Sequence, residues 1–540
     1  MRKRQIGCCV GLAGISLLSG CEPKLGDRTN ILFIFSDDHA LQAITAYSDF
    51  FKSSGFETPN IDRLAEEGAI LLNNTCCNSI SGPSRAAVLT GKHSHANGFT
   101  NNSKSFNPDQ FTFARALQDE GYSTAMIGKW HLGDKLDPRR AGFDDYNVLI
   151  NQGTYYNPEF RTPDGNKTIE GYSTDIIADL SIDWLKDAKK RNRPFLLMCQ
   201  FKAPHRNWQP AMEDLDLFKD VKFPIPEDFR DTTQFSSLPQ YVQDARMRID
   251  GYMFPGWDMK LRDGEVPESY LNLYTGTDQK DPGVTLEQNR LSAADREKYW
   301  ASYEEENKKF YSENPTGRTQ AEWKYQRYIR DYLRTIVAMD RNIGRLLDEL
   351  DKLGLSKNTL VVYSSDQGFF LGEKGFYDKR WMYKQSFSMP FLARLPGVIP
   401  AGTRVTALTQ NIDFAPTFLE VTETKIPDGA GIQGQSFLPL LKGETPASWR
   451  DALYYHFTES RAVESEHYCP AHYGVFDGRY KLIRFYESYA NDTWELYDLQ
   501  EDPDEETNIY NSADKELVNR LTEKLKSLRS QYGDTTGAAL

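Results

Sequence analysis

Four uninterrupted apolar runs stand out in the hydrophobic pattern of this chain. They cover residues 30–36, 123–129, 194–201 and 359–363. A short apolar run of this kind is typical of a strand that is buried on both faces of a parallel sheet. The pattern therefore predicts a central, mostly parallel sheet.

Helical periodicity lies between these runs. Residues 60–68 predict a short helix, 174–190 an amphipathic helix, and 322–350 a long helix with one apolar face. Strands that alternate with helices indicate an α/β domain. The stretch 206–320 is polar and weakly periodic, so we expect a long, partly irregular insertion packed over a binding site.

The pattern changes to short alternating segments after about residue 440. Residues 452–457, 473–485 and 494–499 predict antiparallel strands, and 516–532 predict a terminal amphipathic helix. We therefore expect a smaller α+β subdomain with an antiparallel sheet over residues 441–540.

Acidic residues follow two of the predicted strands. Asp37 and Asp38 come directly after the first strand, and Asp366 and Gln367 follow the strand at 359–363. Sites in α/β proteins lie at the carboxyl ends of the strands. Carboxylate and amide oxygens suit a hard divalent cation, most simply Ca²⁺. A single Asp-Asp pair is more often a cap or a solvated turn, but two such clusters favour a metal site.

Cationic candidates also follow predicted strands. Lys129 and His131 come after the strand at 123–129, His205 follows the strand at 194–201, and Lys379 lies shortly after the second acidic cluster. A lone lysine is usually a solvated surface charge. Several cations that converge on one pocket would stabilise a negatively charged transition state.

The segment 81–91 reads Ser-Gly-Pro-Ser-Arg-Ala-Ala-Val-Leu-Thr-Gly. Its simplest interpretation is an ordinary helix start with Ser81 as cap and Pro83 in the first turn. The segment also resembles the signature of type I sulfatases, Cys/Ser-x-Pro-x-Arg-x-x-x-x-Thr-Gly. In that family the first residue is oxidised to Cα-formylglycine. Its hydrate carries two hydroxyls on one carbon, one to attack sulfur and one to expel sulfate later, whereas a serine hydroxyl alone is a poor nucleophile.

The order of the other motifs along the chain resembles the same family. The resemblance implies an alkaline-phosphatase-like catalytic domain over residues 21–440 and a small C-terminal subdomain. It implies a Ca²⁺ site formed by Asp37, Asp38, Asp366, Gln367 and the modified Ser81. Arg85 would orient the hydrate. The sulfate oxygens would be held by Lys129, His205 and Lys379. His205 would also protonate the leaving alcohol, and His131 would be the base that releases sulfate.

A serine at position 81 has a consequence for maturation. The common aerobic route acts on cysteine, so Ser81 implies a radical-type sulfatase-maturing enzyme as a partner. Without that enzyme position 81 would stay serine, and we expect almost no activity.

Two segments resemble the N-acetylglucosamine-6-O-sulfatases within this family. They are residues 37–44 and 368–380, and the residues around His472 fit the same group. The implied substrate is the 6-O-sulfate of N-acetylglucosamine in glycosaminoglycans such as heparan sulfate. The candidates for binding the sugar hydroxyls are Asp378, Arg380 and His472. A surface ion pair for Arg380 and a strand-end role for His472 are the alternatives.

The N-terminus reads as an export signal. A basic start and the short apolar run 6–18 precede Leu-Ser-Gly-Cys, which resembles a bacterial lipobox cleaved before Cys21 and lipidated on it. We expect residues 1–20 to be a lipoprotein signal peptide and the protein to be anchored on the periplasmic side of a membrane, with a cell-surface location or a plain signal peptide as alternatives.

Composition and charge restrict the partners. The chain has 540 residues, 39% of them hydrophobic, and a formal net charge of −13, which argues against nucleic acid as a general partner. An anionic substrate must therefore be attracted by a local basic site. A disulfide among the four cysteines beyond Cys21 is open.

The sequence leaves three alternative functions open. A sulfatase could act on another sulfated sugar. A phosphodiesterase or phosphonate hydrolase of the same superfamily often carries a second metal site, which the 8 histidines of this chain disfavour. A non-catalytic glycan-binding lipoprotein would not need every expected catalytic position to be filled.

Overall fold

A computed structural model describes residues 24–540, apart from residue 27 and the segments 262–289, 460–466 and 488–491. The predicted signal peptide 1–20 and the lipidation site Cys21 lie outside the described residues. In the described part of the chain, no helix combines the length and apolar character that crossing a membrane requires.

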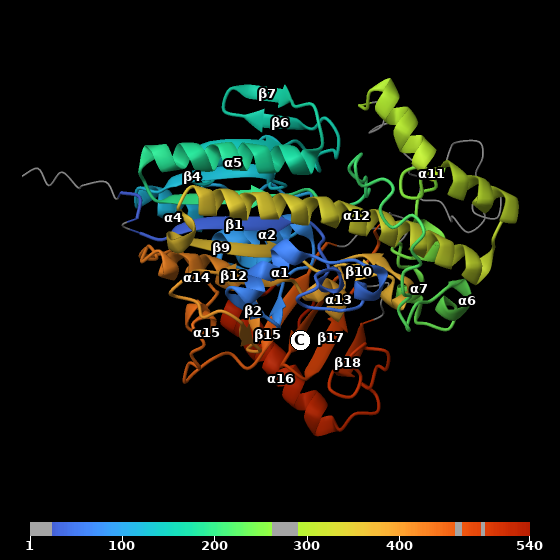
Figure 1. The fold of residues 1–540 in the computed structure, drawn as a ribbon. Helices are drawn as coiled ribbons and strands as arrows, with labels where there is room; N and C mark the ends of the chain where they lie inside the picture. The colour runs from blue at the N-terminus through green and yellow to red at the C-terminus, as the bar shows by residue number, and fades with distance from the viewer. Residues whose placement is uncertain (1–23, 27, 262–289, 460–466, 488–491) are drawn as a thin grey trace, which may run out of the picture.

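A mixed ten-stranded sheet forms the centre of the molecule (Figure 1). Its strand order is β13-β2-β12-β9-β1-β8-β4-β5-β6-β7. The strands are β1 (Asn30–Ser36), β2 (Ala69–Leu71), β4 (Ser123–Lys129), β5 (Asp145–Leu149), β6 (Glu159–Thr162), β7 (Gly165–Thr168), β8 (Phe195–Gln200), β9 (Thr359–Ser365), β12 (Phe391–Arg394) and β13 (Thr403–Val405). The central strands β9, β1, β8, β4 and β5 run parallel, as the apolar runs predict.

Two helical layers cover the faces of this sheet. Side chains of β1 alternate between them: Ile31, Phe33 and Phe35 point into one core, and Leu32 and Ile34 into the other. The first core contains helices α2 (Ser81–Thr90), α4 (Phe113–Asp119) and α14 (Phe414–Val421). The second contains α1 (Pro59–Glu66), α5 (Ser173–Arg191) and α12 (Gly317–Lys352).

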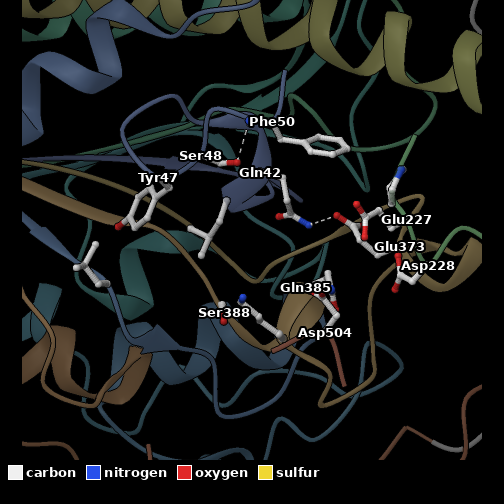
Figure 2. Close-up of a pocket in the computed structure, with 14 residues that line it drawn as sticks. Gln42, Tyr47, Ser48, Phe50, Glu227, Asp228, Glu373, Gln385, Ser388 and Asp504 are labelled. Atoms are coloured by element: carbon white, nitrogen blue, oxygen red, sulfur yellow. Dashed lines mark hydrogen bonds between the residues drawn. The ribbon is translucent and has the colours of Figure 1, made fainter. Parts of the chain in front are cut away.

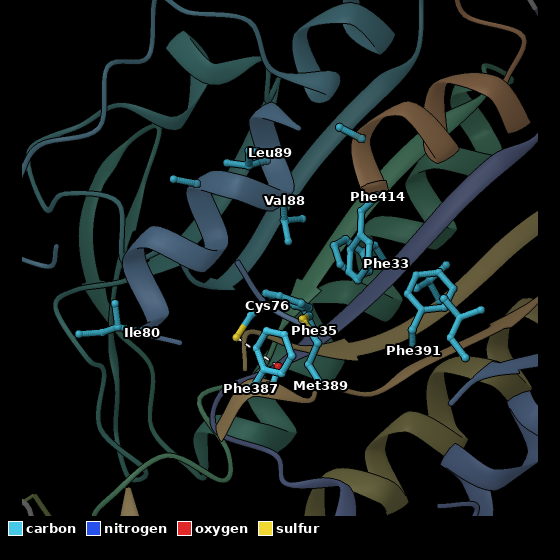
Figure 3. Close-up of a cluster of buried hydrophobic side chains, with 14 of the residues drawn as sticks. Phe33, Phe35, Cys76, Ile80, Val88, Leu89, Phe387, Met389, Phe391 and Phe414 are labelled. Carbon is cyan, nitrogen blue, oxygen red and sulfur yellow. Dashed lines mark hydrogen bonds between the residues drawn. The ribbon is translucent and has the colours of Figure 1, made fainter. Parts of the chain in front are cut away.

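The first core fixes the position of α2. Figure 3 shows Ile80, Val88 and Leu89 on or beside α2 in the same apolar cluster as Phe33 of β1 and Phe414 of α14. Every residue of α2 is buried. A fully buried helix of ten residues cannot shift without breaking this packing, so its N-terminus is held rigidly beside the sheet.

The insertion predicted at 206–320 contains more helix than its sequence indicates. Short helices α6 (Thr232–Phe235), α7 (Gln240–Gln243) and α8 (Ile249–Tyr252) are followed by α11 (Ala293–Glu313), a helix of 21 residues. Its buried residues include Tyr299, Tyr303 and Phe310, on an otherwise charged helix. The narrow aromatic stripe was too weak a signal for a helix to be predicted.

A four-stranded antiparallel sheet forms the C-terminal region, drawn in orange and red in Figure 1. Its strands are β15 (Leu453–Phe457), β16 (His472–Phe476), β17 (Tyr480–Phe485) and β18 (Thr493–Asp498), and helix α16 (Lys515–Tyr532) covers one face. The other face joins the first core of the large sheet through Leu453, Tyr455 and Ile483. The four described cysteines are buried and free of disulfides.

Candidate active site

The acidic residues meet at the carboxyl ends of β1 and β9. The parallel register pairs Ser36 with Ser365, so the segments that follow leave the sheet side by side. The Asp38 backbone N–H donates to Asp366 Oδ1 at 3.1 Å. Asp37, Asp38, Asp366 and Gln367 are all fully buried. Segments 328 residues apart in sequence thus form one cluster of oxygen atoms.

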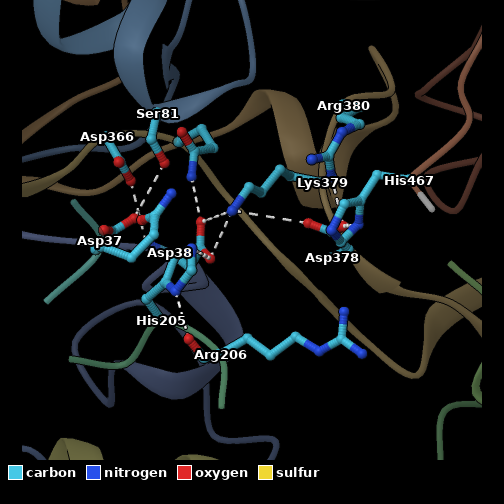
Figure 4. Close-up of polar contacts among 12 residues, drawn as sticks. Asp37, Asp38, Ser81, His205, Arg206, Asp366, Asp378, Lys379, Arg380 and His467 are labelled. Carbon is cyan, nitrogen blue, oxygen red and sulfur yellow. Dashed lines mark hydrogen bonds and ion pairs between the residues drawn. The ribbon is translucent and has the colours of Figure 1, made fainter. Parts of the chain in front are cut away.

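Ser81 begins helix α2 and faces this cluster (Figure 4). Its Oγ donates to Asp37 Oδ1 at 3.1 Å. Gly82 is required next to it, because a Cβ there would lie 2.5 Å from the Phe99 ring and 2.6 Å from Asn102 Oδ1. Gly91 ends the helix at φ 65°, in the left-handed region that favours glycine. The motif glycines and Pro83 therefore set where Ser81 points.

Arg85 lies one helical turn after Ser81 and ties α2 to the acids. Its Nε and Nη2 donate to Asp366 Oδ2 at 3.2 and 3.1 Å. It also donates to the side chain of Gln200 and to the Lys129 carbonyl oxygen. Burial lowers the pKa of Arg85, and Asp366 opposes that effect. Such a fully engaged guanidinium holds position 81 and Asp366 in fixed relation.

Two ammonium groups pair with the remaining acids. Lys379 Nζ lies 2.7 Å from both carboxylate oxygens of Asp38, and Lys129 pairs with Asp37. Burial raises the pKa of Asp38 to about 7, partly offset by Lys379, and Asp366 raises it further. The buried cluster therefore balances three carboxylates against three cations: Arg85, Lys129 and Lys379.

The donor set fits a hard divalent cation. Gln367 Oε1 is buried and accepts no hydrogen bond, while its Nε2 donates to Asp38 Oδ1 at 2.5 Å. Among the described residues, ligand atoms of Asp37, Asp38 and His205 lie within 4.8 Å of one another. Carboxylate and amide oxygens with one unsatisfied acceptor are what Ca²⁺ or Mg²⁺ would use.

Two histidines flank the cluster. His205 Nε2 lies 3.8 Å from Asp38 Oδ2, and Gln152 Nε2 lies 3.0 Å from His131 Nε2. Burial, reinforced by Lys129, holds the pKa of both histidines well below the usual range. His131 Nδ1 is buried with no hydrogen-bond partner. Both rings are therefore neutral at physiological pH in this environment, which leaves each a ring nitrogen able to accept a proton.

A second polar group lies across the cavity from Ser81. Asp378 pairs with Arg380, and His467 Nδ1 lies 2.7 Å from Asp378 Oδ2 (Figure 4). Burial alone would raise the pKa of Asp378, but Arg380, His467 and Lys379 hold it well below the usual range. Asp378 therefore stays ionised and can accept hydrogen bonds.

The two groups share one cavity of about 390 Å³, which Ser81, His131, His205 and the Asp378 group line. This volume falls in the range of small-molecule sites. Five of the residues around it have positive φ although they are not glycine: Asp38 (65°), His131 (54°), Asp378 (80°), Arg380 (92°) and His467 (66°). Strained backbone of this kind gathers at functional sites.

One sequence prediction is wrong. His472 lies in β16, fully buried, and does not line the cavity. Its Nε2 accepts from the Met382 backbone N–H at 3.1 Å and its Nδ1 donates to the Pro470 carbonyl oxygen at 2.7 Å. Both ring nitrogens are used for structure, so His472 has none left for a sugar. The other predicted site residues all lie in or directly behind the cavity.

Several cavity residues were not predicted. They are Asn102, Gln152, Arg206, Trp257, Phe369 and His467. Gln152 Oε1 accepts from Lys129 Nζ at 2.5 Å, so this one amide contacts both Lys129 and His131. Most of these residues come from loops and the insertion, where no strand end or motif marks them.

The fold and this site define a class of protein. The sulfatase family model matches residues 29–280 and 287–424, and a model of the C-terminal part of N-sulphoglucosamine sulphohydrolase matches residues 372–531. The chain belongs to the sulfatase family and has its alkaline-phosphatase-like fold. It is a sulfuric ester hydrolase.

Individual relatives narrow the comparison. The chain is 41% identical over 538 residues to the N-acetylglucosamine-6-O-sulfatase of Bacteroides thetaiotaomicron, covering 97% of this chain and 91% of that protein. It is 24% identical to the human N-acetylglucosamine-6-sulfatase, covering 98% and 88%. It also resembles a solved structure in complex with its substrate, D-glucosamine-2-N,6-O-disulfate, with 40% identity, a TM-score of 0.85, and coverage of 94% of this chain and 99% of that one.

Proposed function

We propose that this enzyme hydrolyses the 6-O-sulfate of N-acetylglucosamine, or of a related glucosamine unit, in glycosaminoglycans. One observation carries the proposal: a single cavity holds Ser81 with its cationic neighbours at one end and the Asp378–Arg380–His467 group at the other. A volume of about 390 Å³ accommodates one sulfated sugar unit rather than a long glycan segment. The similarity to proteins that act on 6-sulfated glucosamines supports this choice of substrate.

Ca²⁺ is the proposed metal, held by Asp37, Asp38, Asp366, Gln367 and position 81. When bound, it supplies positive charge that acidifies a hydroxyl at position 81 and attracts sulfate oxygens. The charge balance supports this assignment. Arg85, Lys129 and Lys379 pair with the three buried carboxylates, so a divalent ion would add the positive charge that a sulfate ester needs.

Position 81 is the proposed nucleophile after oxidation of Ser81 to formylglycine. The Ser81 side chain already lines the cavity and contacts Asp37, and a hydrated aldehyde at this position would place a hydroxyl at the same point. Lys129 and Lys379, which approach from two sides of the acid cluster, would hold the sulfate oxygens. Arg85 would keep position 81 aligned through Asp366.

Proton transfers fall to the two histidines. His131 is neutral, and its Nε2 faces the Gln152 amide N–H group, so Nε2 is the acceptor nitrogen of the ring; this suits a base that removes the last hydroxyl proton. His205 must donate a proton to the leaving alcohol. Its pKa is low beside Lys129 and Lys379, and the negative charge of a bound sulfate ester would raise it.

Sugar recognition is assigned to Asp378 and Arg380, with His467 in place of His472. Asp378 would accept from sugar hydroxyls, and Arg380 would donate to them. The pairing of these two side chains fixes where an acceptor and a donor lie, so it can distinguish sugars that differ in the direction of one hydroxyl. Hydrogen-bonding sites of this kind discriminate strongly.

Maturation and location are proposed from the sequence. The serine at position 81 requires a radical-type sulfatase-maturing enzyme, and Cys21 would carry a lipid that anchors the protein in the periplasm. A phosphonate or phosphodiester substrate is the alternative activity. Among the described residues there is no second cluster of metal-ligand side chains to support it.

The test compares sulfate release from three sugars by the formylglycine-containing enzyme. The substrates are N-acetylglucosamine 6-sulfate, N-acetylglucosamine 3-sulfate and N-acetylgalactosamine 6-sulfate. We expect the first to be turned over at least about a hundredfold faster than the others, the discrimination that two lost hydrogen bonds produce. Preference for the galactose configuration would overturn the substrate, and no sulfate release from any sulfate ester would overturn the activity.

A further inference from the structure

A second cavity lies apart from the catalytic one. It has a volume of about 530 Å³, and among the described residues the two cavities share no lining side chain. Figure 2 shows it bordered by the segment around Gln42 and Phe50 on one side and by Glu227, Asp228 and Gln385 on the other. The proposed function assigns nothing to this cavity.

Hydrogen-bond acceptors dominate its wall. Four carboxyl groups line it, those of Glu227, Asp228, Glu373 and Asp504, against one cation, Lys384. The Glu227 and Asp504 side chains are exposed and make no hydrogen bond or ion pair with any described residue. Glu373 is 9% exposed, and its carboxylate accepts hydrogen bonds from Gln42 Nε2 and from the Leu371 backbone N–H, both at 2.6 Å. The outer carboxylates therefore remain available to a ligand.

A buried amide supplies independent evidence for a ligand. Gln385 is 7% exposed, lines the cavity, and its Oε1 accepts no hydrogen bond. Buried polar atoms almost always have a partner, so an orphaned acceptor on a side chain that lines a cavity indicates a missing donor. Burial raises the pKa of Glu373 to about 7 and that of Asp228 to about 6.

The shape of the cluster excludes two ligand classes. Among the described residues, these carboxylates do not form a set whose oxygens lie within 4.8 Å of one another, so they are too dispersed for a metal ion. The excess of carboxylates would repel a sulfated sugar. What fits is a ligand of several ångströms that donates many hydrogen bonds and carries positive charge. The side chains of Tyr47 and Phe50 also line the cavity and offer ring surfaces for apolar C–H groups.

We propose that this cavity binds a hexosamine unit with a free, protonated amine, separately from catalysis. The ammonium group would donate to one of the two exposed carboxylates, Glu227 or Asp504, and a hydroxyl would donate to Gln385 Oε1. An N-acetylated sugar loses the charge, and an N-sulfated sugar reverses it. The cavity would thus select glucosamine units that carry no substituent on nitrogen.

The experiment is calorimetric titration of the full mature protein with D-glucosamine, N-acetylglucosamine, D-glucose and CaCl₂. We expect D-glucosamine to bind with a Kd on the order of 1 mM and the two neutral sugars about tenfold more weakly, since one charge-assisted hydrogen bond is lost. The variant Glu227→Gln/Asp504→Asn should weaken D-glucosamine binding about tenfold and leave sulfate release unchanged. Arg380→Ala, which alters the catalytic cavity, should leave this binding intact.

The remaining outcomes would overturn the proposal. They are equal binding of D-glucosamine and N-acetylglucosamine, loss of binding in Arg380→Ala but not in Glu227→Gln/Asp504→Asn, and no detectable binding. Tight Ca²⁺ binding that the double variant removes would assign the cavity to a cation instead. Sulfate release is measured in parallel, so failure of this proposal is distinguishable from failure of the proposed sulfatase activity.

Discussion

The variant Asp378→Asn tests the assignment of the sugar-binding end of the cavity. Asp378 accepts from Arg380 and lies 2.7 Å from His467 Nδ1, and both contacts depend on its negative charge. Asparagine keeps the size of the side chain but removes that charge. A hydrogen bond to a charged group contributes about 1.5–3 kcal/mol, so losing one between Asp378 and the sugar should lower kcat/KM about 10- to 150-fold.

The assay compares two substrates on the same preparation. In the proposed binding mode N-acetylglucosamine 6-sulfate would contact both ends of the cavity, whereas 4-nitrophenyl sulfate carries the sulfate ester but no sugar hydroxyls. We expect the full loss on the sugar and less than about a threefold loss on the aryl sulfate. Asp137→Asn is the matched control, because Asp137 also pairs with an arginine two residues later, Arg139, but at the surface. Equal losses on the two substrates would refute the assignment of Asp378 to sugar binding.

Three further predictions concern stability and metal. Burial raises the pKa of Glu373 from 4.5 to about 7, so the folded protein binds the carboxyl proton more tightly than the unfolded chain does. The free energy of unfolding should therefore fall by up to about 3 kcal/mol as pH rises from 4.5 to about 7. Glu373→Gln should flatten this pH dependence in urea unfolding curves, and an unchanged slope would contradict the cause given. Removing Ca²⁺ with a chelator should abolish sulfate release. It should also lower Tm, because Ca²⁺ at a hundred times its Kd adds about 2.7 kcal/mol to the free energy of unfolding. The variant Asp366→Asn should show no Ca²⁺-dependent shift of Tm. His472→Ala should cost about 1–3 kcal/mol of stability, because the Met382 N–H loses its acceptor, and leave kcat/KM on the sugar unchanged; a selective loss of kcat/KM would restore His472 to the site.

The strands of the large sheet were the most predictable part of the fold. The predicted bounds 30–36 and 123–129 agree with β1 and β4, because a strand that is buried on both faces has a mostly apolar sequence without alternation. Helix α11 could not be predicted in the same way. The buried face of this charged helix consists of a few aromatic side chains and Asn307. Tertiary packing stabilises the helix, and the sequence shows no strong apolar periodicity that would reveal it.

The closeness of several site residues could be predicted from the ends of the strands and from one motif. The carboxyl ends of parallel strands meet at one edge of a sheet, so Asp37 and Asp366 could be expected to lie together. His467 and Trp257 could not, since they reach the cavity from segments without regular structure. The error at His472 has a simple origin. The predicted strand began at residue 473, so His472 was expected outside it, whereas β16 begins at His472 and every residue of that strand is buried.

The proposed catalysis depends on position 81 acting, once oxidised, beside the buried acid cluster. The most direct measurement is the rate of sulfate release from N-acetylglucosamine 6-sulfate by preparations in which mass spectrometry gives the converted fraction of Ser81. We predict a rate proportional to that fraction, and no release by Ser81→Ala. Release by fully unconverted protein or by Ser81→Ala at the rate of the converted enzyme would contradict the account.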